Sequence, residues 1–170
     1  MRRREFVFSL AALAAAPPWR LRGQSGVGEP KALTAEEKEI LGHICERIVP
    51  EDEYPGARKL GAVEFIDRLL KEAHPDWIVV YRIGLKATDK NARRLFGKPF
   101  IELAPQQQDD LLRRMERGEF HISKCDGVPC EEFFAMVRSH TMHGCYSHPK
   151  WGGNRDKAAW KMIGYDDWWA

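Results

Sequence analysis

Four side chains able to bind a transition metal lie within nine residues near the end of this 170-residue chain: His140, His143, Cys145 and His148. Zinc and copper prefer imidazole and thiolate ligands. A helix would place His140 and His143, three positions apart, on one face. No Cys-x-x-Cys pair accompanies them, and histidines near helix ends commonly bond to free carbonyl groups instead. We therefore expect no metal. The alternative is that the chain is a free-standing, exported protein that binds a metal ion through these four residues.

The cysteines offer a second kind of chemistry. Cys125 and Cys130 bracket a turn-forming segment, and an oxidising compartment would permit a disulfide between them. Four cysteines allow three complete pairings, and spacing alone does not choose among them. Cys45 lies on an apolar face and is predicted to be a small buried residue. The chain has no Cys-x-x-Cys-His motif, so attachment of a c-type haem is not expected.

Motifs for other common activities are missing from the sequence. It contains no Gly-x-Gly-x-x-Gly run, no phosphate loop and no serine in a nucleophile-elbow context. We therefore predict no catalytic residues and no cofactor-binding residues in this chain. The formal net charge of +2 is too small to indicate binding to the phosphates of nucleic acid, so nucleic acid is not an expected partner.

The N-terminal segment, residues 1–24, has the pattern of an export signal. A basic start is followed by eleven apolar or small residues at 6–16, which are too few to span a membrane. The order Arg3-Arg4-Glu5-Phe6 resembles the twin-arginine signal, whose pathway carries proteins already folded in the cytoplasm. An ordinary secretion signal, a membrane-surface helix and an uncleaved membrane tether are the alternatives. Residues 25–32 are interpreted as a linker.

From residue 33 to residue 170 the pattern predicts a single helical domain. Apolar residues recur every three or four positions, and no stretch alternates with a period of two. Thr34 and Glu37 have the spacing of a capping box. The stretches predicted to be helical are 34–49, 60–73, 77–96, 105–117 and 129–146. We predict an all-α fold, a compact bundle of about five helices followed by an irregular C-terminal segment rich in aromatic residues and glycine.

The third of these stretches carries the clearest helical period. Its predicted inward positions are Trp77, Val80, Tyr81, Gly84, Leu85, Thr88, Ala92, Leu95 and Phe96.

The C-terminal segment is predicted to contact a partner. Gly152-Gly153-Asn154 requires a tight turn or a close backbone approach, and four of the six tryptophans lie between 151 and 169. Tryptophan is enriched at interfaces because it buries a large area at low entropic cost. Trp160 is predicted to pack in the core. The predicted partner contacts are Trp151, Gly152, Gly153, Asn154, Trp168 and Trp169.

These motifs carry a family resemblance. The C-terminal ones are His140-Thr141, Gly144, Ser147, Pro149, Trp151-Gly152-Gly153-Asn154 and Trp160-Lys161-x-Ile163-Gly164-Tyr165. The upstream ones are Leu33-Thr34, Ile48-Val49-Pro50, Gly61-x-x-x-Phe65-Ile66-Asp67 and Leu103-x-Pro105. Together they resemble the signature of the gluconate 2-dehydrogenase subunit 3 family over nearly the whole chain. At His143, Cys145 and His148 the chain departs from the more usual acidic or aromatic residues, so the resemblance does not support a metal site.

The resemblance implies a small, non-catalytic subunit of an exported sugar or sugar-acid dehydrogenase. In such complexes a large flavoprotein subunit of the glucose-methanol-choline type holds FAD, and a multihaem cytochrome c subunit accepts the electrons. The small subunit binds the folded flavoprotein and supplies the signal for the twin-arginine translocase, here Arg3, Arg4 and Phe6. The expected location is the periplasm, with membrane association through the complex.

Overall fold

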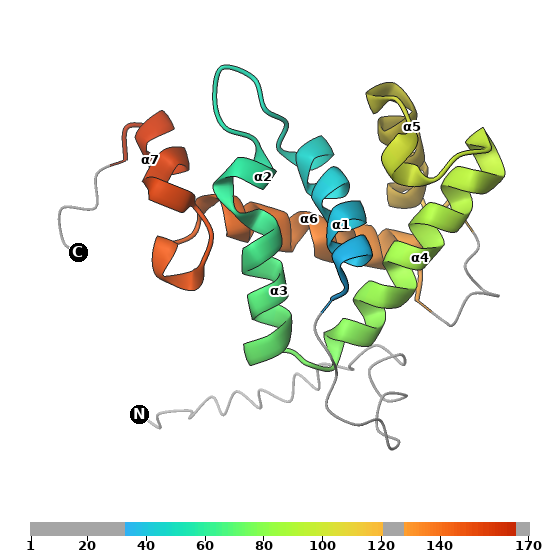
Figure 1. Ribbon diagram of the computed structural model, residues 1–170, viewed down its shortest axis with the longest axis horizontal. Coiled ribbons are helices and arrows are strands. Elements are labelled where there is room, and N and C mark those ends of the chain that lie inside the picture. Colours follow the sequence, from blue (N-terminus) through green and yellow to red (C-terminus); the bar gives the residue numbers. More distant parts are fainter. Residues whose placement is uncertain (1–32, 121–127, 166–170) are drawn as a thin grey trace, which may run out of the picture.

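Helices make up all the regular structure in the residues that the computed structural model describes, 33–120 and 128–165 (Figure 1). The α-helices are α1 (Ala35–Ile48), α2 (Ala57–Leu60), α3 (Ala62–Glu72), α4 (Trp77–Phe96), α5 (Pro105–Glu116), α6 (Cys130–Tyr146) and α7 (Ala158–Met162). Short 3₁₀-helices are η2 (Phe100–Glu102), η4 (Pro149–Trp151) and η5 (Arg155–Lys157). The predicted all-α fold is confirmed. The predictions for Arg3, Arg4, Phe6, Cys125, Trp168 and Trp169 lie outside the described residues.

Helix α1 begins at the predicted capping box. The Glu37 amide donates to Thr34 Oγ1 at 3.2 Å, and the Thr34 amide donates to a Glu37 carboxylate oxygen at 2.7 Å. Two amides that the helix leaves without backbone partners are thereby satisfied. The inward face of α1 buries Leu41, Ile44 and Cys45, so the prediction of a buried Cys45 is confirmed.

The predicted helix 60–73 corresponds to α3, which begins two residues later than expected, at Ala62. Gly61 adopts φ +84°, a left-handed conformation that ends α2 after Leu60 and lets α3 begin in a new direction. Leu60 is the last residue of α2, a short helix that the sequence pattern did not predict. The apolar period continues across Gly61, so the pattern placed the start of the longer helix two residues too early.

Helix α4 has the predicted bounds, Trp77–Phe96, and Gly97 ends it with φ +72°. Most of its predicted inward positions are buried, and Tyr81 and Leu85 are completely so. Trp77 and Phe96, at the two ends of the helix, are half-buried, and Leu95 is 38% exposed.

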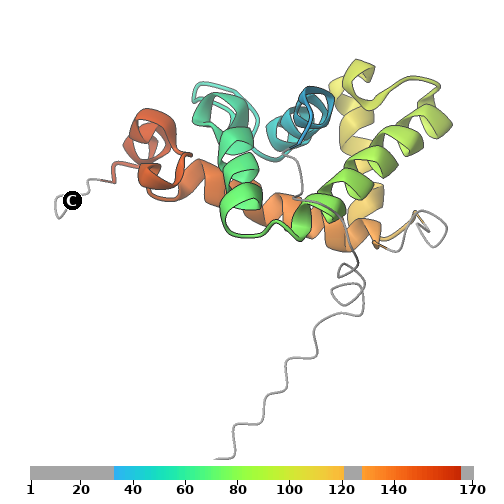
Figure 2. The same ribbon diagram turned by 60° about the horizontal axis from the view of Figure 1, so that its bottom comes forward.

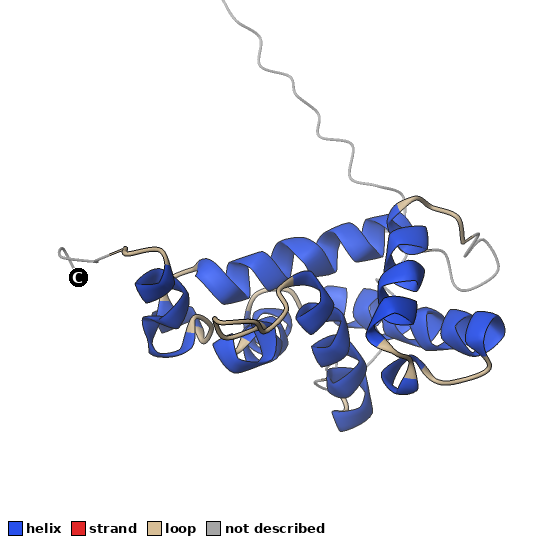
Figure 3. Cartoon of the chain, turned by 90° about the horizontal axis from the view of Figure 1, so that it is seen from above, coloured by secondary structure: helices blue, strands red, loops and turns tan. Residues whose placement is uncertain are grey.

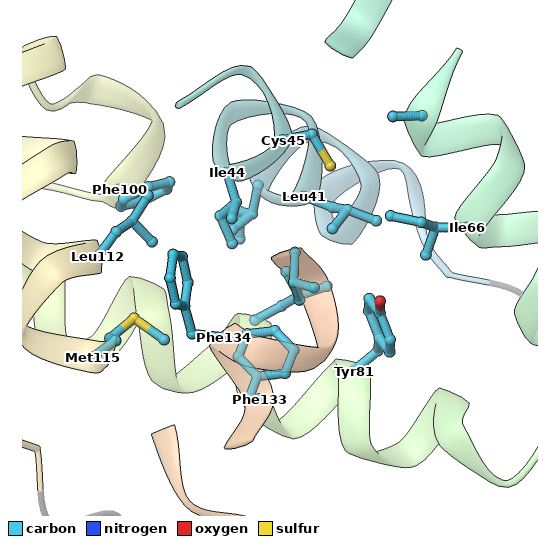
Figure 4. Packing of buried hydrophobic residues seen from close by; sticks show 14 of the residues in the cluster. Leu41, Ile44, Cys45, Ile66, Tyr81, Phe100, Leu112, Met115, Phe133 and Phe134 are labelled. Carbon is cyan, nitrogen blue, oxygen red and sulfur yellow. The ribbon is translucent and has the colours of Figure 1, made fainter. Parts of the chain in front are cut away.

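Helix α6 runs the length of the molecule, and the other long helices lie on one side of it (Figures 2 and 3). It packs against α1, α3, α4 and α5, while α7 lies beyond its C-terminal end. Figure 4 shows Phe133 of α6 beside Tyr81 of α4, and Phe134 on the side of Leu112 of α5. The side of α6 turned away from the core carries Glu131, Glu132, Ala135, Ser139 and Met142, which are exposed. In the described residues, no helix is long and apolar enough to cross a membrane.

Glycine at the crossing of α4 and α6 leads to the first prediction. A Cβ on Gly84 would lie 2.3–2.5 Å from the ring of Phe133, which is buried and cannot swing away. We expect Gly84→Ala to lower the free energy of unfolding by about 1–3 kcal/mol, the usual range for overpacking, in urea titrations followed by circular dichroism. Gly42→Ala is the matched control, because its Cβ meets only the flexible end of Arg58. Equal effects of the two substitutions would contradict this account.

Candidate functional site

His140 lies inside the bundle as part of an aromatic stack. Its Nδ1 is 2.8 Å from the Tyr81 hydroxyl, and its ring is parallel to that of Tyr81 and stacked on that of Trp77. Burial, assisted by the neighbouring His143 and His74, lowers the pKa of His140 to about 4. The imidazole is therefore neutral at physiological pH, and its role in the described structure is to connect α6 with α4.

The other candidate metal ligands point elsewhere. His143 is exposed, since three helical positions rotate it about 60° from His140. Cys145 is buried, and the ring of His148 packs edge-on against Trp160 while its Nδ1 accepts from the Lys150 amide. Within the described residues, no three His, Cys, Asp or Glu side chains form a group that could hold a metal ion. The structure thus separates the four residues whose spacing suggested a site.

The described cysteines lie in the core. Burial raises the pKa of both Cys45 and Cys145 to about 12, so these thiols are protonated and poorly nucleophilic. The Thr141 hydroxyl donates to the Val137 carbonyl at 2.8 Å and lies 3.2 Å from Cys45 Sγ. Cys130 is buried at the first turn of α6. The pairing of Cys130 with Cys125 stays a prediction.

Asn154 organises the segment that follows α6. Its amide donates to the Gly144 carbonyl at 2.7 Å, and its side-chain amide donates to the Ser147 carbonyl at 3.2 Å. Its Oδ1 accepts from the amide of Ala159, in the first turn of α7. The backbone of Asn154 is left-handed, with φ +44°, a conformation that asparagine tolerates better than most residues. These bonds hold the turn against the end of α6.

Two predicted partner contacts are corrected by this arrangement. Asn154 is completely buried, and Gly153 is buried with its backbone against Gly144, so neither presents a surface to another protein. A Cβ at Gly153 would lie 2.0 Å from the Gly144 carbonyl oxygen, which explains why glycine occupies this position. The turn that the sequence indicated is present, but Gly153 and Asn154 brace it from inside.

Trp151 and Gly152 are the predicted contacts that remain exposed. Trp151 is 55% exposed, and the Lys150 ammonium lies 5.0 Å from the centre of its ring. Gly152 ends η4 with φ +97°. The guanidinium of Arg68 donates to the Lys150 carbonyl at 3.2 Å and so ties η4 to α3. Trp151 is therefore exposed on η4, and the hydrogen bond from Arg68 holds η4 against α3.

Trp160 occupies an intermediate position. It is half-buried rather than in the core, and its indole N–H donates to the Tyr146 carbonyl at 2.8 Å. Its ring packs edge-on against His148 and Tyr165, which joins α7 to the end of α6.

Sequence reasoning missed a hollow beside Trp151, walled by Phe65 and Leu69 of α3. The only available signal was the apolar face of α3, which also predicts burial in the core.

The described residues form an all-α domain in which Trp151, on η4 beyond the end of α6, is exposed at the surface. A family model described as gluconate 2-dehydrogenase subunit 3 matches residues 35–167, and the chain belongs to this family. No curated protein and no solved structure matches the chain.

Burial of His140 predicts a loss of stability in acid. Its pKa is about 4 in the folded state and about 6.5 in the unfolded chain, so above pH 6.5 it contributes no pH dependence. As the pH falls from 6.5 to 4, the unfolded chain binds a proton that the folded chain excludes, and the free energy of unfolding falls by about 3 kcal/mol. In urea titrations across this range, we expect His140→Gln to remove that part of the slope. Identical slopes for both proteins would refute the assignment.

Asn154 yields a prediction about the local stability of the C-terminal segment. Asn154→Ala removes two side-chain hydrogen bonds and puts alanine in a left-handed conformation, which together should cost about 2–4 kcal/mol. We expect hydrogen exchange to become much faster at the backbone amides of positions 154 and 159, while the amides of α1 and α4 keep their exchange rates. The control is Arg155→Ala, which removes only an exposed ion pair with Glu64. Unchanged exchange at position 159 would show that Asn154 does not brace the turn.

Proposed function

We propose that the chain is a non-catalytic subunit of an exported FAD-dependent dehydrogenase complex, and that it binds the folded flavoprotein subunit of the glucose-methanol-choline type. The observation that carries this proposal is the family match over residues 35–167, which includes every described helix. A family whose description is that of a dehydrogenase subunit implies a partner enzyme. The partner would hold FAD, and this chain would hold no cofactor of its own.

The N-terminal segment supports an export role. Arg3, Arg4 and Phe6 have the order of a twin-arginine signal, and they precede the family match. Because that pathway carries folded proteins, one signal can serve two subunits that have already assembled. We propose that the twin-arginine translocase delivers the complex to the periplasm, where a multihaem cytochrome c subunit would take the electrons and the complex would associate with the membrane.

The form of the C-terminal segment is compatible with partner binding. An exposed tryptophan loses little conformational entropy on binding when its backbone is already held in place. Here Asn154 and Arg68 provide that support through hydrogen bonds to the Ser147 and Lys150 carbonyls. Trp151 therefore has the properties of an interface anchor.

The test is a pull-down from the native host. A tag at the C-terminal end of the full chain is used to recover the protein from the periplasmic fraction, and the absorption spectrum of the eluate is recorded. We expect one large partner in stoichiometric amount, with the bands of a flavin. The double variant Arg3→Lys/Arg4→Lys should leave both proteins in the cytoplasm, still bound to each other.

The two parts of the proposal fail separately. A chain recovered without flavin from a host that expresses the dehydrogenase would disprove the subunit role. Export of the double-lysine variant at the normal level would disprove the twin-arginine signal and leave the subunit role standing.

A further inference from the structure

The hollow beside Trp151 is shaped to receive a side chain. It encloses about 300 Å³ between α3, the end of α6 and η4, and its apolar walls include Phe65, Leu69 and Trp151. Sites for whole cofactors and drug-sized molecules begin at about this volume and extend to three times more. One large apolar side chain is therefore the better match in size.

One polar atom at the hollow has no hydrogen-bond partner. The Oγ of Ser147, a residue that lines the hollow, is buried and forms no hydrogen bond with any described residue. Buried hydroxyl groups are nearly always satisfied in folded proteins, by protein groups or by water, and this hydroxyl can reach a group that binds in the hollow. A backbone N–H or C=O that enters with the side chain would supply such a group.

The charges at the rim indicate what lies next to that side chain. Arg68 is neutralised by both carboxylate oxygens of Glu72, at 3.0 and 2.9 Å. The Lys150 ammonium lies over the Trp151 ring and has no carboxylate within ion-pair distance among the described residues. The rim therefore carries one unbalanced positive charge beside an apolar hollow. Its complement is an apolar side chain with a carboxylate close by.

We propose that this hollow is the docking site for an apolar side chain from an acidic segment of the dehydrogenase subunit. Binding would cover the exposed part of Trp151, satisfy Ser147 Oγ and pair Lys150 with a carboxylate. This proposal rests on the proposed function, since it assigns the surface through which the subunit holds its partner.

The first test uses a photo-crosslinking amino acid. A benzophenone side chain replaces Trp151 in the full, tagged chain, and the complex is irradiated in the native host before purification. We expect a covalent adduct with the flavin-containing subunit, and the crosslinked peptide should contain Asp or Glu within a few residues of the attachment point. The same group in place of Val79, which is 50% exposed on α4, is the control and should give no such adduct.

The second test measures how fast the partner leaves. The flavin that remains on the immobilised chain during washing gives the dissociation rate. We expect Trp151→Ala to accelerate dissociation about 30-fold, as for an interface hot spot, and Val79→Ala to have no effect. Lys150→Glu should weaken retention and reduce its sensitivity to salt. Arg113→Glu, an equal change of charge at an exposed position of α5, should not.

The outcomes separate this inference from the proposed function. If the wild-type chain retains the flavoprotein and both Trp151→Ala and Lys150→Glu retain it equally well, the docking site is wrong and the subunit role stands. A crosslink from position 151 to residues 166–170 of the same chain, found in the assembled complex, would also overturn the proposal, because the chain would then fill its own hollow. If the wild-type chain retains no flavoprotein, the proposed function itself fails.

Discussion

The close packing of α6 against its neighbours is the constraint on which the rest of the structure depends. At two crossing points the contact is possible only because glycine has no side chain: Gly84 of α4 lies under the Phe133 ring, and Gly144 of α6 lies against the backbone of Ala62. Interiors of proteins are packed at crystal density, so a single added methyl group at such a point is felt throughout the contact. The close approach at these glycines lets the single long helix α6 pack against the other long helices of the bundle.

The same helix connects the core to the surface. Thr141 and Cys145 face α1 from the last two turns of α6, and the carbonyl of Gly144 accepts the hydrogen bond that positions Asn154. Just beyond, the carbonyls of Tyr146 and Ser147 accept from Trp160 and Asn154. The C-terminal segment is therefore built on carbonyl groups that the end of a helix leaves free. The position of the C-terminal segment therefore depends on where the packing of α6 places these carbonyl groups.

The four metal-binding residue types show how position in the fold changes chemistry. His140 is buried in an aromatic stack with Tyr81, whereas His143 faces solvent one turn away. Their spacing of three positions suggested a shared metal site, but it places His140 in the core and His143 at the surface. At this end of the chain, the surface hollow is lined by residues of α3, of the end of α6, His143 among them, and of η4. Arg68 of α3 donates a hydrogen bond to the Lys150 carbonyl, 82 positions later in the chain.

Local sequence determined the features that depend on neighbouring residues. The helical period gave the bounds of α4, the capping box gave the start of α1, and glycine after Phe96 gave a helix end, because each depends on backbone groups a few positions apart. Tertiary structure alone decided that Gly61 separates α2 from α3, that Asn154 is buried while Trp151 is exposed, and that Phe65 and Trp151 wall one hollow. Burial depends on which distant surfaces meet, and that information is not contained in the spacing of residues along one segment.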